Sequence, residues 1–209
     1  MTAAWFISDL HLKDINERSG NVLLRFLHSL DSGERPVTHL FLLGDIFDLW
    51  VGNHQYFYQK FQPIVDMLVK LRHKGVEIQY FEGNHDMHVV DFWQGHLGIP
   101  CWVEAKYVRV GALTLRLEHG DLINLSDEKY LKYRAFMRTP MIESLAKFLP
   151  GKVIDSIGEM ASKKSRKHSS KYRESREQEL REMVRAHALR SYKEIPFDAI
   201  ITGHMHIID

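Results

Sequence analysis

The sequence has one cysteine, almost no net charge and no long apolar run, and each shortage excludes a class of protein. Cys101 cannot form an internal disulfide, so the fold does not depend on an oxidising compartment. The 28 basic and 27 acidic residues leave a net charge of +1, which argues against a surface built for nucleic acid, and we expect no such partner. No window approaches the ~20 apolar residues of a membrane span, and the N-terminus lacks the features of a secretory signal. We therefore expect a cytoplasmic protein whose contact with a membrane, if it has any, is peripheral.

The length, hydrophobic content and apolar patterning of the chain predict a layered α/β core. Its 209 residues fit one domain, 1–209, and 44% of them are hydrophobic. Apolar residues at helical spacing over 22–30 and 61–71 predict two amphipathic helices, with Pro63 in the first turns of the second. Strand-like apolar runs occupy residues 3–7, 40–43, 78–81, 113–117 and 199–201. These elements predict helices covering a sheet.

Two segments modify this simple pattern. The runs at 103–110 and 113–117 are joined through Gly111 and Ala112, which predicts a hairpin and therefore a mixed sheet. Between about 126 and 192 the strand signals vanish and helix formers dominate, so we interpret this segment as a helical insertion.

Five short polar blocks each follow one of the strand-like runs. Because the carboxyl ends of strands in an open α/β sheet are where ligands bind, these blocks are expected to converge on one crevice. Any one of them alone is typical of a turn or a cap, but five in order are hard to obtain that way. The blocks are Asp9-Leu10-His11, Gly44-Asp45-Ile46-Phe47-Asp48, Gly83-Asn84-His85-Asp86, His119-Gly120-Asp121 and Gly203-His204-Met205-His206.

The side chains in these blocks form a set of metal ligands too large for one ion. If Asp45 bridges two ions, each receives four protein ligands and keeps open positions for water and substrate. Two cations ~3.5–4 Å apart lower the pKa of a shared water and hold the oxygens of a phosphoryl group. The mixed nitrogen and oxygen donors suit Mn first, with Fe, Zn or Co as alternatives, better than Ca or Mg. One predicted set is Asp9, His11, Asp45 and His206, and the other is Asp45, Asn84, His119 and His204.

With these five blocks, the sequence resembles the calcineurin-like metallophosphoesterases over residues 9–206. The resemblance implies a four-layer α-β-β-α sandwich with a dinuclear metal centre, and it implies the same seven ligands. It also implies that His85 contacts the phosphoryl group and protonates the leaving oxygen, with Asp48 as its orienting partner. An imidazole suits this role because its pKa lies near neutral pH.

The segment after the fourth block narrows the resemblance. Asp127, Tyr130, Arg134 and Pro140, followed by the helical insertion, look like the UDP-2,3-diacylglucosamine diphosphatases of lipid A biosynthesis. This likeness implies a lipid-linked nucleotide as substrate, cleavage to UMP and 2,3-diacylglucosamine 1-phosphate, and a helical cap that holds the acyl chains. It also implies that Asp127, Tyr130 and Arg134 contact the substrate.

The insertion carries two apolar stripes and one basic run. The stripes, at 141–149 and 153–160, either pack on the core or line an acyl pocket beside the metal crevice. The basic run is either a solvated loop, a partner for the pyrophosphate, or a contact with the anionic leaflet of the inner membrane. Its candidate substrate-binding residues are Lys163, Lys164, Lys167 and Lys171.

Two alternative functions stay open from the sequence. The diphosphatases carry arginine where this chain has His85, which keeps open a phosphoesterase for soluble phosphoproteins, nucleotides or cyclic nucleotides. A non-catalytic metal-binding scaffold is the second alternative, and the intact set of seven ligands ranks it last.

Overall fold

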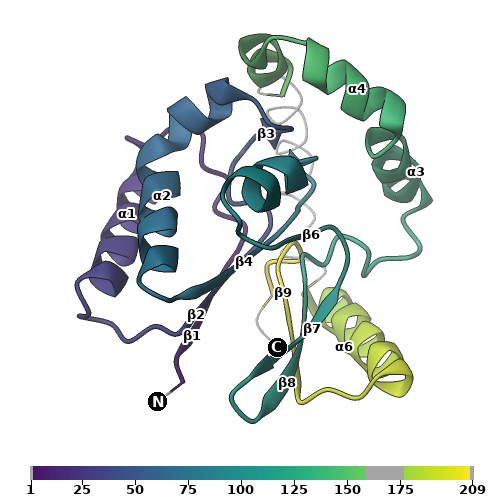
Figure 1. Cartoon of the computed structure of the whole chain (residues 1–209). Helices are drawn as coiled ribbons and strands as arrows, with labels where there is room; N and C mark the ends of the chain where they lie inside the picture. Colours follow the sequence, from purple (N-terminus) through teal and green to yellow (C-terminus); the bar gives the residue numbers. More distant parts are fainter. Residues whose placement is uncertain (1, 159–176, 208–209) are drawn as a thin grey trace.

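The protein is built around two sheets that face each other (Figure 1), as seen in a computed structural model that describes residues 2–158 and 177–207. The first sheet is parallel, in the order β1-β2-β4-β6. In the second sheet β7 and β8 pair antiparallel, and β9 joins β8 in parallel. The hairpin and the mixed strand directions are thereby confirmed. The strands are β1 (Ala4–Ile7), β2 (His39–Leu43), β4 (Glu77–Phe81), β6 (Cys101–Trp102), β7 (Lys106–Val110), β8 (Leu113–Glu118) and β9 (Ala199–Thr202), with a separate pair β3 (Trp50–Val51) and β5 (Asp86–Met87).

Side-chain alternation along β2 explains how the layers hold together. Leu40 and Leu42 point into the core cluster shared with helices α1 (Arg18–Asp31) and α2 (Gln55–His73), which cover the outer face of the first sheet (Figure 1). Phe41 and Leu43 point the other way, into a cluster with Leu115 and Leu117 of β8. Each face of the first sheet is therefore buried, by helices on one side and by the second sheet on the other.

Helix α6 (Glu177–Glu194) supplies the fourth layer. The His187 Nε2 atom lies 2.5 Å from the Glu118 carboxylate of β8, and the Tyr192 ring meets Phe197 edge-on at 5.6 Å. The order is thus helices, sheet, sheet, helix, which confirms the expected α-β-β-α sandwich.

Helix α2 begins earlier than the sequence pattern suggested. The prediction placed Pro63 in its first turns, whereas the helix starts at Gln55 and Pro63 lies inside it. Proline removes one main-chain hydrogen bond and crowds the preceding turn, and Phe61 accordingly leaves helical geometry, with φ −117° and ψ 17°. The extra turns form because Phe57 and Phe61 are fully buried.

The region 126–192 is mainly helical where it is described, and its helices lie in two places. α3 (Glu128–Met137), α4 (Pro140–Phe148) and a helical stretch at 151–158 lie near the ends of the strands, whereas α6 lies against the second sheet (Figure 1). A short π-helix, η1 (Asp91–His96), precedes β6. Lys163, Lys164, Lys167 and Lys171 fall outside the described residues.

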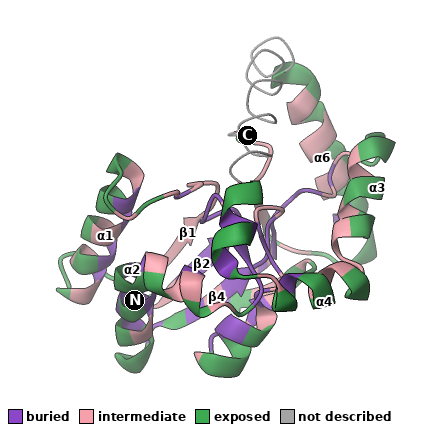
Figure 2. Cartoon of the chain, turned by 90° about the horizontal axis from the view of Figure 1, so that it is seen from above, coloured by how far each residue is buried: buried purple, intermediate pink, exposed green. Residues whose placement is uncertain are grey.

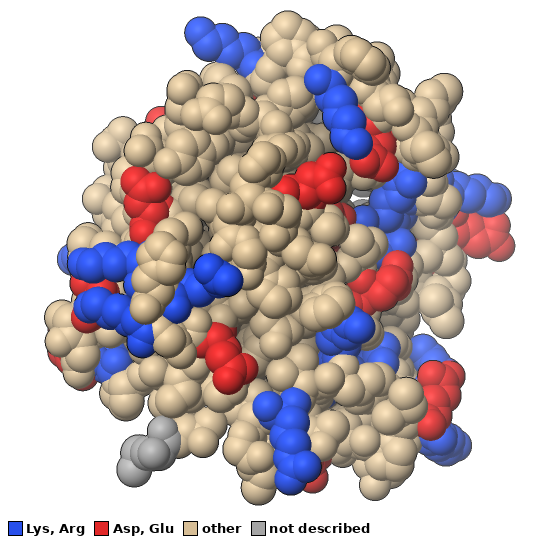
Figure 3. Space-filling model, in the orientation of Figure 1, with Lys and Arg blue, Asp and Glu red and all other residues tan. Residues whose placement is uncertain are grey.

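The surface of the described residues carries charges of both signs. On the face shown in Figure 3, basic and acidic side chains are interspersed, so this face presents no strong field of one sign. Within the described ranges, no helix combines the length and the apolar character needed to cross a membrane.

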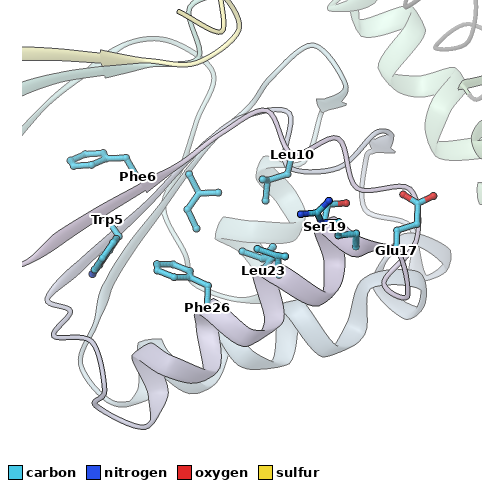
Figure 4. Close-up of a pocket in the computed structure, with 10 residues that line it drawn as sticks. Trp5, Phe6, Leu10, Glu17, Ser19, Leu23 and Phe26 are labelled. Atoms are coloured by element: carbon cyan, nitrogen blue, oxygen red, sulfur yellow. The ribbon is translucent and has the colours of Figure 1, made fainter. Parts of the chain in front are cut away.

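A cavity of about 760 Å³ lies between β1 and α1. Figure 4 shows the side chains of Trp5, Phe6, Leu10, Leu23 and Phe26 around it, and its lining is mostly apolar. None of the seven predicted metal ligands lines this cavity. The candidate site therefore lies elsewhere, at the carboxyl ends of the strands.

Candidate metal centre

The first two polar blocks run side by side as they leave β1 and β2. The main-chain N–H of Asp9 donates to the Gly44 carbonyl at 3.1 Å, and that of His11 donates to the Asp45 carbonyl at 3.0 Å. These bonds continue the parallel pairing of the two strands beyond their ends. As a result, side chains 36 residues apart in sequence reach the same edge of the sheet.

Five of the seven predicted ligands have left-handed backbone conformations. Such conformations cost roughly 1–3 kcal/mol each in residues other than glycine, and they persist at sites where the surroundings enforce them. Strain concentrated in this way is typical of a functional site. The five residues are Asp9 (φ 55°), His11 (φ 47°), Asp45 (φ 53°), His204 (φ 60°) and His206 (φ 51°).

Two glycines provide the space in which the ligands meet. Gly44 has φ +81°, and a Cβ atom there would lie 2.6 Å from Nδ1 of His119. A Cβ atom at Gly83 would collide with the carboxylate of Asp45. Any side chain at either position would displace a predicted ligand.

The predicted ligands gather in two neighbouring groups, within each of which the ligand atoms lie within 4.8 Å of one another. Asp45 lies between the groups, because its Oδ2 atom is 3.9 Å from His11 Nε2 and 3.6 Å from His119 Nε2. The amide oxygen of Asn84 lies 3.3 Å from His119 Nε2 and so joins the second group. The first group is Asp9, His11 and His206, and the second is Asp45, His119 and His204.

The donor set at His119 fits a bound cation. Its Nδ1 atom donates to the main-chain carbonyl of Leu43 at 2.8 Å, so Nε2 is the ring atom that faces the oxygens of Asn84 and Asp45. Burial lowers the pKa of His119, but the charges of Asp45, Asp9 and Asp121 outweigh it and raise that pKa overall. A positive charge is therefore favoured at Nε2, where a bound cation would take the place of the proton, and a carbonyl bonded to the remote ring nitrogen is the usual support of a metal-binding histidine.

Burial and neighbouring charges set the protonation of the ligands. Burial alone would raise the pKa of Asp9, but its hydrogen bond to His206 and the charge of His119 hold that pKa well below its usual range. Burial lowers the pKa of His204 to about 4 and also lowers the pKa of His11. Asp9 is therefore ionised and these two imidazoles are neutral at neutral pH, which are the states that metal ligands require.

His85 is held in place by the second block. Its main-chain N–H donates to Asp45 Oδ1, and its ring Nδ1 donates to the main-chain carbonyl of Asp48, both at 2.8 Å. The ring stands edge-on to His11, with centroids 4.7 Å apart. Asp48 thus contacts His85 through its main chain, while its carboxylate lies in a further cluster with His11 and His85.

The three predicted substrate contacts of α3 already have partners within the protein. The Tyr130 hydroxyl donates to Asp121 at 2.9 Å, and Arg134 Nε donates to the same carboxylate at 2.6 Å. Burial raises the pKa of Asp121, but His119 and Arg134 outweigh it and lower that pKa overall. Asp127 caps α3 by accepting from the Tyr130 N–H at 3.0 Å. Tyr130 also lies beside His204, with ring centroids 5.8 Å apart.

Sequence reasoning missed the buried support beneath Asp45. Asp86 is fully buried and accepts hydrogen bonds from the N–H groups of Asp45, Ile46 and Gly83 and from the hydroxyl of Tyr80. Burial and the charge of Asp45 raise the pKa of Asp86. The third block signalled Asp86 as part of the site, but no pattern connected it to Tyr80 within the preceding strand.

Comparison with known proteins places this site in a family. The calcineurin-like phosphoesterase family matches residues 3–207. The chain belongs to this family. Membership makes it a metal-dependent hydrolase, in agreement with the two groups of converging ligands.

Individual members of the family are similar over nearly the whole chain. A UDP-2,3-diacylglucosamine hydrolase from Haemophilus influenzae is 26% identical over 207 residues, covering 99% of this chain and 84% of that protein. The protein of the same name from Chromohalobacter salexigens is 28% identical over 96% of this chain and 78% of its own. That from Neisseria gonorrhoeae is 25% identical over 99% and 83%. The crystal structure of an uncharacterized protein from Streptococcus pneumoniae, described as a predicted phosphoesterase, overlaps 64% of this chain and 54% of its own, with 16% identity and a TM-score of 0.28.

Proposed function

We propose that this chain hydrolyses the pyrophosphate of UDP-2,3-diacylglucosamine, releasing UMP and 2,3-diacylglucosamine 1-phosphate. The observation that carries the proposal is the similarity, over 96–99% of the chain, to proteins named for this hydrolysis. The converging ligands at the strand ends support the chemistry, and the helices beside them support the lipid part of the substrate.

The proposed metal centre holds two divalent cations, with manganese as the first expectation. Asp9, His11, Asp45 and His206 would hold one, and Asp45, Asn84, His119 and His204 the other. When bound, these cations would lower the pKa of a shared water and neutralise charge on the phosphoryl oxygens. Asp45 suits the bridging position because its carboxylate lies within 4 Å of a histidine in each group.

His85 is the proposed general acid. The Asp48 carbonyl fixes the ring through Nδ1, so Nε2 is the atom that can hold the proton for the leaving oxygen. The ring lies next to His11, and therefore next to the first group of ligands. Asp48 serves as its orienting partner through the main chain.

The helices near the site leave apolar side chains uncovered. On α4, Met141, Leu145 and Phe148 follow one another at helical spacing and are 66%, 52% and 87% exposed. Ala146 on the same helix is buried, so α4 packs by one face and leaves another apolar face free. In the helical stretch at 151–158, Val153 and Ile157 are also exposed, at 43% and 58%. Such a surface suits acyl chains, and it also suits peripheral contact with the membrane that supplies them.

The test is the release of UMP from UDP-2,3-diacylglucosamine by the manganese-loaded protein. Bis-p-nitrophenyl phosphate, p-nitrophenyl phosphate and cyclic AMP serve as soluble comparison substrates. We expect a strong preference for the lipid nucleotide. No UMP release, with the soluble esters hydrolysed, would overturn the proposal and favour the phosphoesterase for soluble substrates that His85 suggests.

A paired substitution tests the acyl surface. Phe148→Ser is expected to raise KM for the lipid nucleotide and to leave hydrolysis of bis-p-nitrophenyl phosphate unchanged. Leu189→Ser is the matched control, because Leu189 is a 64% exposed apolar residue on α6. Equal KM values for the two variants would remove α4 from the proposed binding surface.

A further inference from the structure

The C-terminal end of α3 is attached to the loop that carries the third block. Arg138, which follows the last helical residue, donates from Nη1 to Glu82 Oε2 at 2.6 Å and from Nη2 to the Gly83 carbonyl at 3.3 Å. His88 Nε2 donates to the Met137 carbonyl at 2.8 Å. The end of the helix is therefore bound on both sides of the segment that presents Asn84 and His85.

Glu82 makes this attachment strong. Its side chain is 1% exposed, and its second oxygen accepts the N–H of Val89 at 2.7 Å, so one carboxylate closes the loop from 82 to 89. A buried carboxylate without a cationic partner is strongly unfavourable. Arg138 is that partner, and the conformation of the loop depends on its presence.

α3 is also attached to the loop that carries the fourth block, through Tyr130 near its start and Arg134 in its last turn. Tyr130 and Arg134 both bind Asp121, two residues after His119. One helix thus connects the loops that present Asn84 and His119, two proposed ligands of the same metal. A narrow crevice lined by Asn84, Tyr130, Arg134 and Arg138 marks the contact between the helix and these loops.

α3 has little apolar packing that would otherwise fix its position. None of its residues is buried, and Tyr133 and Phe136 are 52% and 51% exposed (Figure 2). Most stable helices in proteins are positioned by an apolar face. Met137 packs against the core at the end of this helix, and the other contacts that position it are polar contacts to the two ligand-bearing loops.

We infer that α3 is a brace between the third and fourth blocks, and that Arg138 is a positioning residue for Asn84 and His85. Among the residues that the structure describes, no hydrogen bond, ion pair or ring contact joins Asp9, His11 or His206 to α3, so the brace acts on one metal site and not equally on both. The inference rests on the proposed dinuclear centre but not on the lipid substrate.

The experiment compares Arg138→Met, Arg138→Lys and Glu82→Gln with the unmodified chain. Manganese binding is measured by calorimetric titration of the metal-free protein, and kcat and KM are measured with bis-p-nitrophenyl phosphate. Lys132→Met is the matched control, because Lys132 lies on the exposed face of α3 and pairs only with Glu128 in the described structure.

We expect Arg138→Met to weaken one of two manganese sites by about 10–100-fold, as loss of a residue supporting a ligand does, and to leave the other within twofold. We expect kcat to fall with KM unchanged, and Arg138→Lys to restore part of both losses. Glu82→Gln should weaken the same manganese site and lower kcat in the same way. Combining Glu82→Gln with Arg138→Met should cause little further loss, because both substitutions remove the same ion pair. Lys132→Met should match the unmodified chain.

Three results distinguish failure of the inference from failure of the proposed function. Unchanged affinity at both sites in Arg138→Met, or an equal loss at both, would overturn the inference alone. If circular dichroism shows that Arg138→Met does not fold, Arg138→Lys and Glu82→Gln test the inference in its place. The inference then stands only if these variants lose manganese affinity at one site and keep it at the other. An unmodified chain that binds no second manganese ion would overturn the dinuclear centre and the inference together.

Discussion

Replacing Asp86 by asparagine tests how the proposed bridging ligand is held. Asp86 Oδ1 accepts the N–H groups of Asp45 and Gly83, at 3.0 Å and 2.7 Å, and Oδ2 accepts the Ile46 N–H at 2.9 Å and the Tyr80 hydroxyl at 2.5 Å. Asparagine has the same shape, but its NH2 group must replace one of these oxygens. Only the Tyr80 hydroxyl can turn to accept a hydrogen bond. At least one buried main-chain N–H therefore loses its acceptor.

The expected loss of stability follows from that count. An unsatisfied buried donor costs about 1–3 kcal/mol. Burial and the charge of Asp45 raise the pKa of Asp86, so removing its charge works in the opposite direction. We therefore expect Asp86→Asn to lower the free energy of unfolding by about 1–2 kcal/mol, and to weaken manganese binding because the Asp45 loop shifts.

Urea unfolding in EDTA measures the free energy of unfolding without any contribution from bound metal. Calorimetric titration with manganese measures the metal affinity. Asp66→Asn is the control, because Asp66 is an exposed residue of α2 that accepts hydrogen bonds from Tyr58 and Gln62. It should change stability by less than about 0.5 kcal/mol. Unchanged stability together with unchanged metal affinity in Asp86→Asn would refute the argument that Asp86 positions Asp45.

Three further predictions concern the ligands, the proposed acid and the attachment of the helices. Asp45→Ala should remove both metals, as measured by elemental analysis after gel filtration, and one retained equivalent would show that Asp45 does not bridge. His85→Ala should keep both metals and lower kcat by about 10²–10⁴-fold, as loss of a general acid does; loss of metal would contradict that role. Asp155→Ala should lower the melting temperature, because it leaves Lys60 and Tyr56 of α2 without the carboxylate that lies 2.7 Å from each; an unchanged melting curve would mean that this contact contributes nothing.

The main features of the fold and of the site were predictable because they depend on the order of strands. Parallel strands end at one edge of a sheet, so polar residues after each strand had to converge, and Asp9, Asn84 and His204 lie together for that reason. The predicted ligands fall into two groups because Asp45 lies between them, within 4 Å of His11 and of His119.

What the sequence did not reveal depends on side chains that meet across the fold. Tyr80 and Asp86 lie in a strand and a loop whose contact no periodic pattern predicts, and the pairing of Arg138 with Glu82 joins residues 56 positions apart. The start of α2 was missed because Pro63 looks like a first-turn residue, whereas Phe57 and Phe61 bury enough apolar surface to continue the helix across a kink.

The contacts that attach α3, α4 and the stretch at 151–158 to the rest of the protein help to decide between a lipid-linked and a soluble substrate. His54 Nε2 donates to the Ala146 carbonyl at 2.6 Å, Lys60 pairs with Asp155, and Arg138 pairs with Glu82. These contacts are polar: the first holds α4, the second holds the stretch at 151–158, and the third holds the end of α3. They leave most of the apolar side chains of α4 and of 151–158 unused. A helix that served only as a structural layer would turn residues such as Phe148 inward, because each buried side chain of that size contributes about 1.5–3 kcal/mol. Polar attachment combined with an exposed apolar face is the arrangement expected of helices that bind acyl chains beside a phosphoesterase centre, and it favours the lipid nucleotide over the soluble esters.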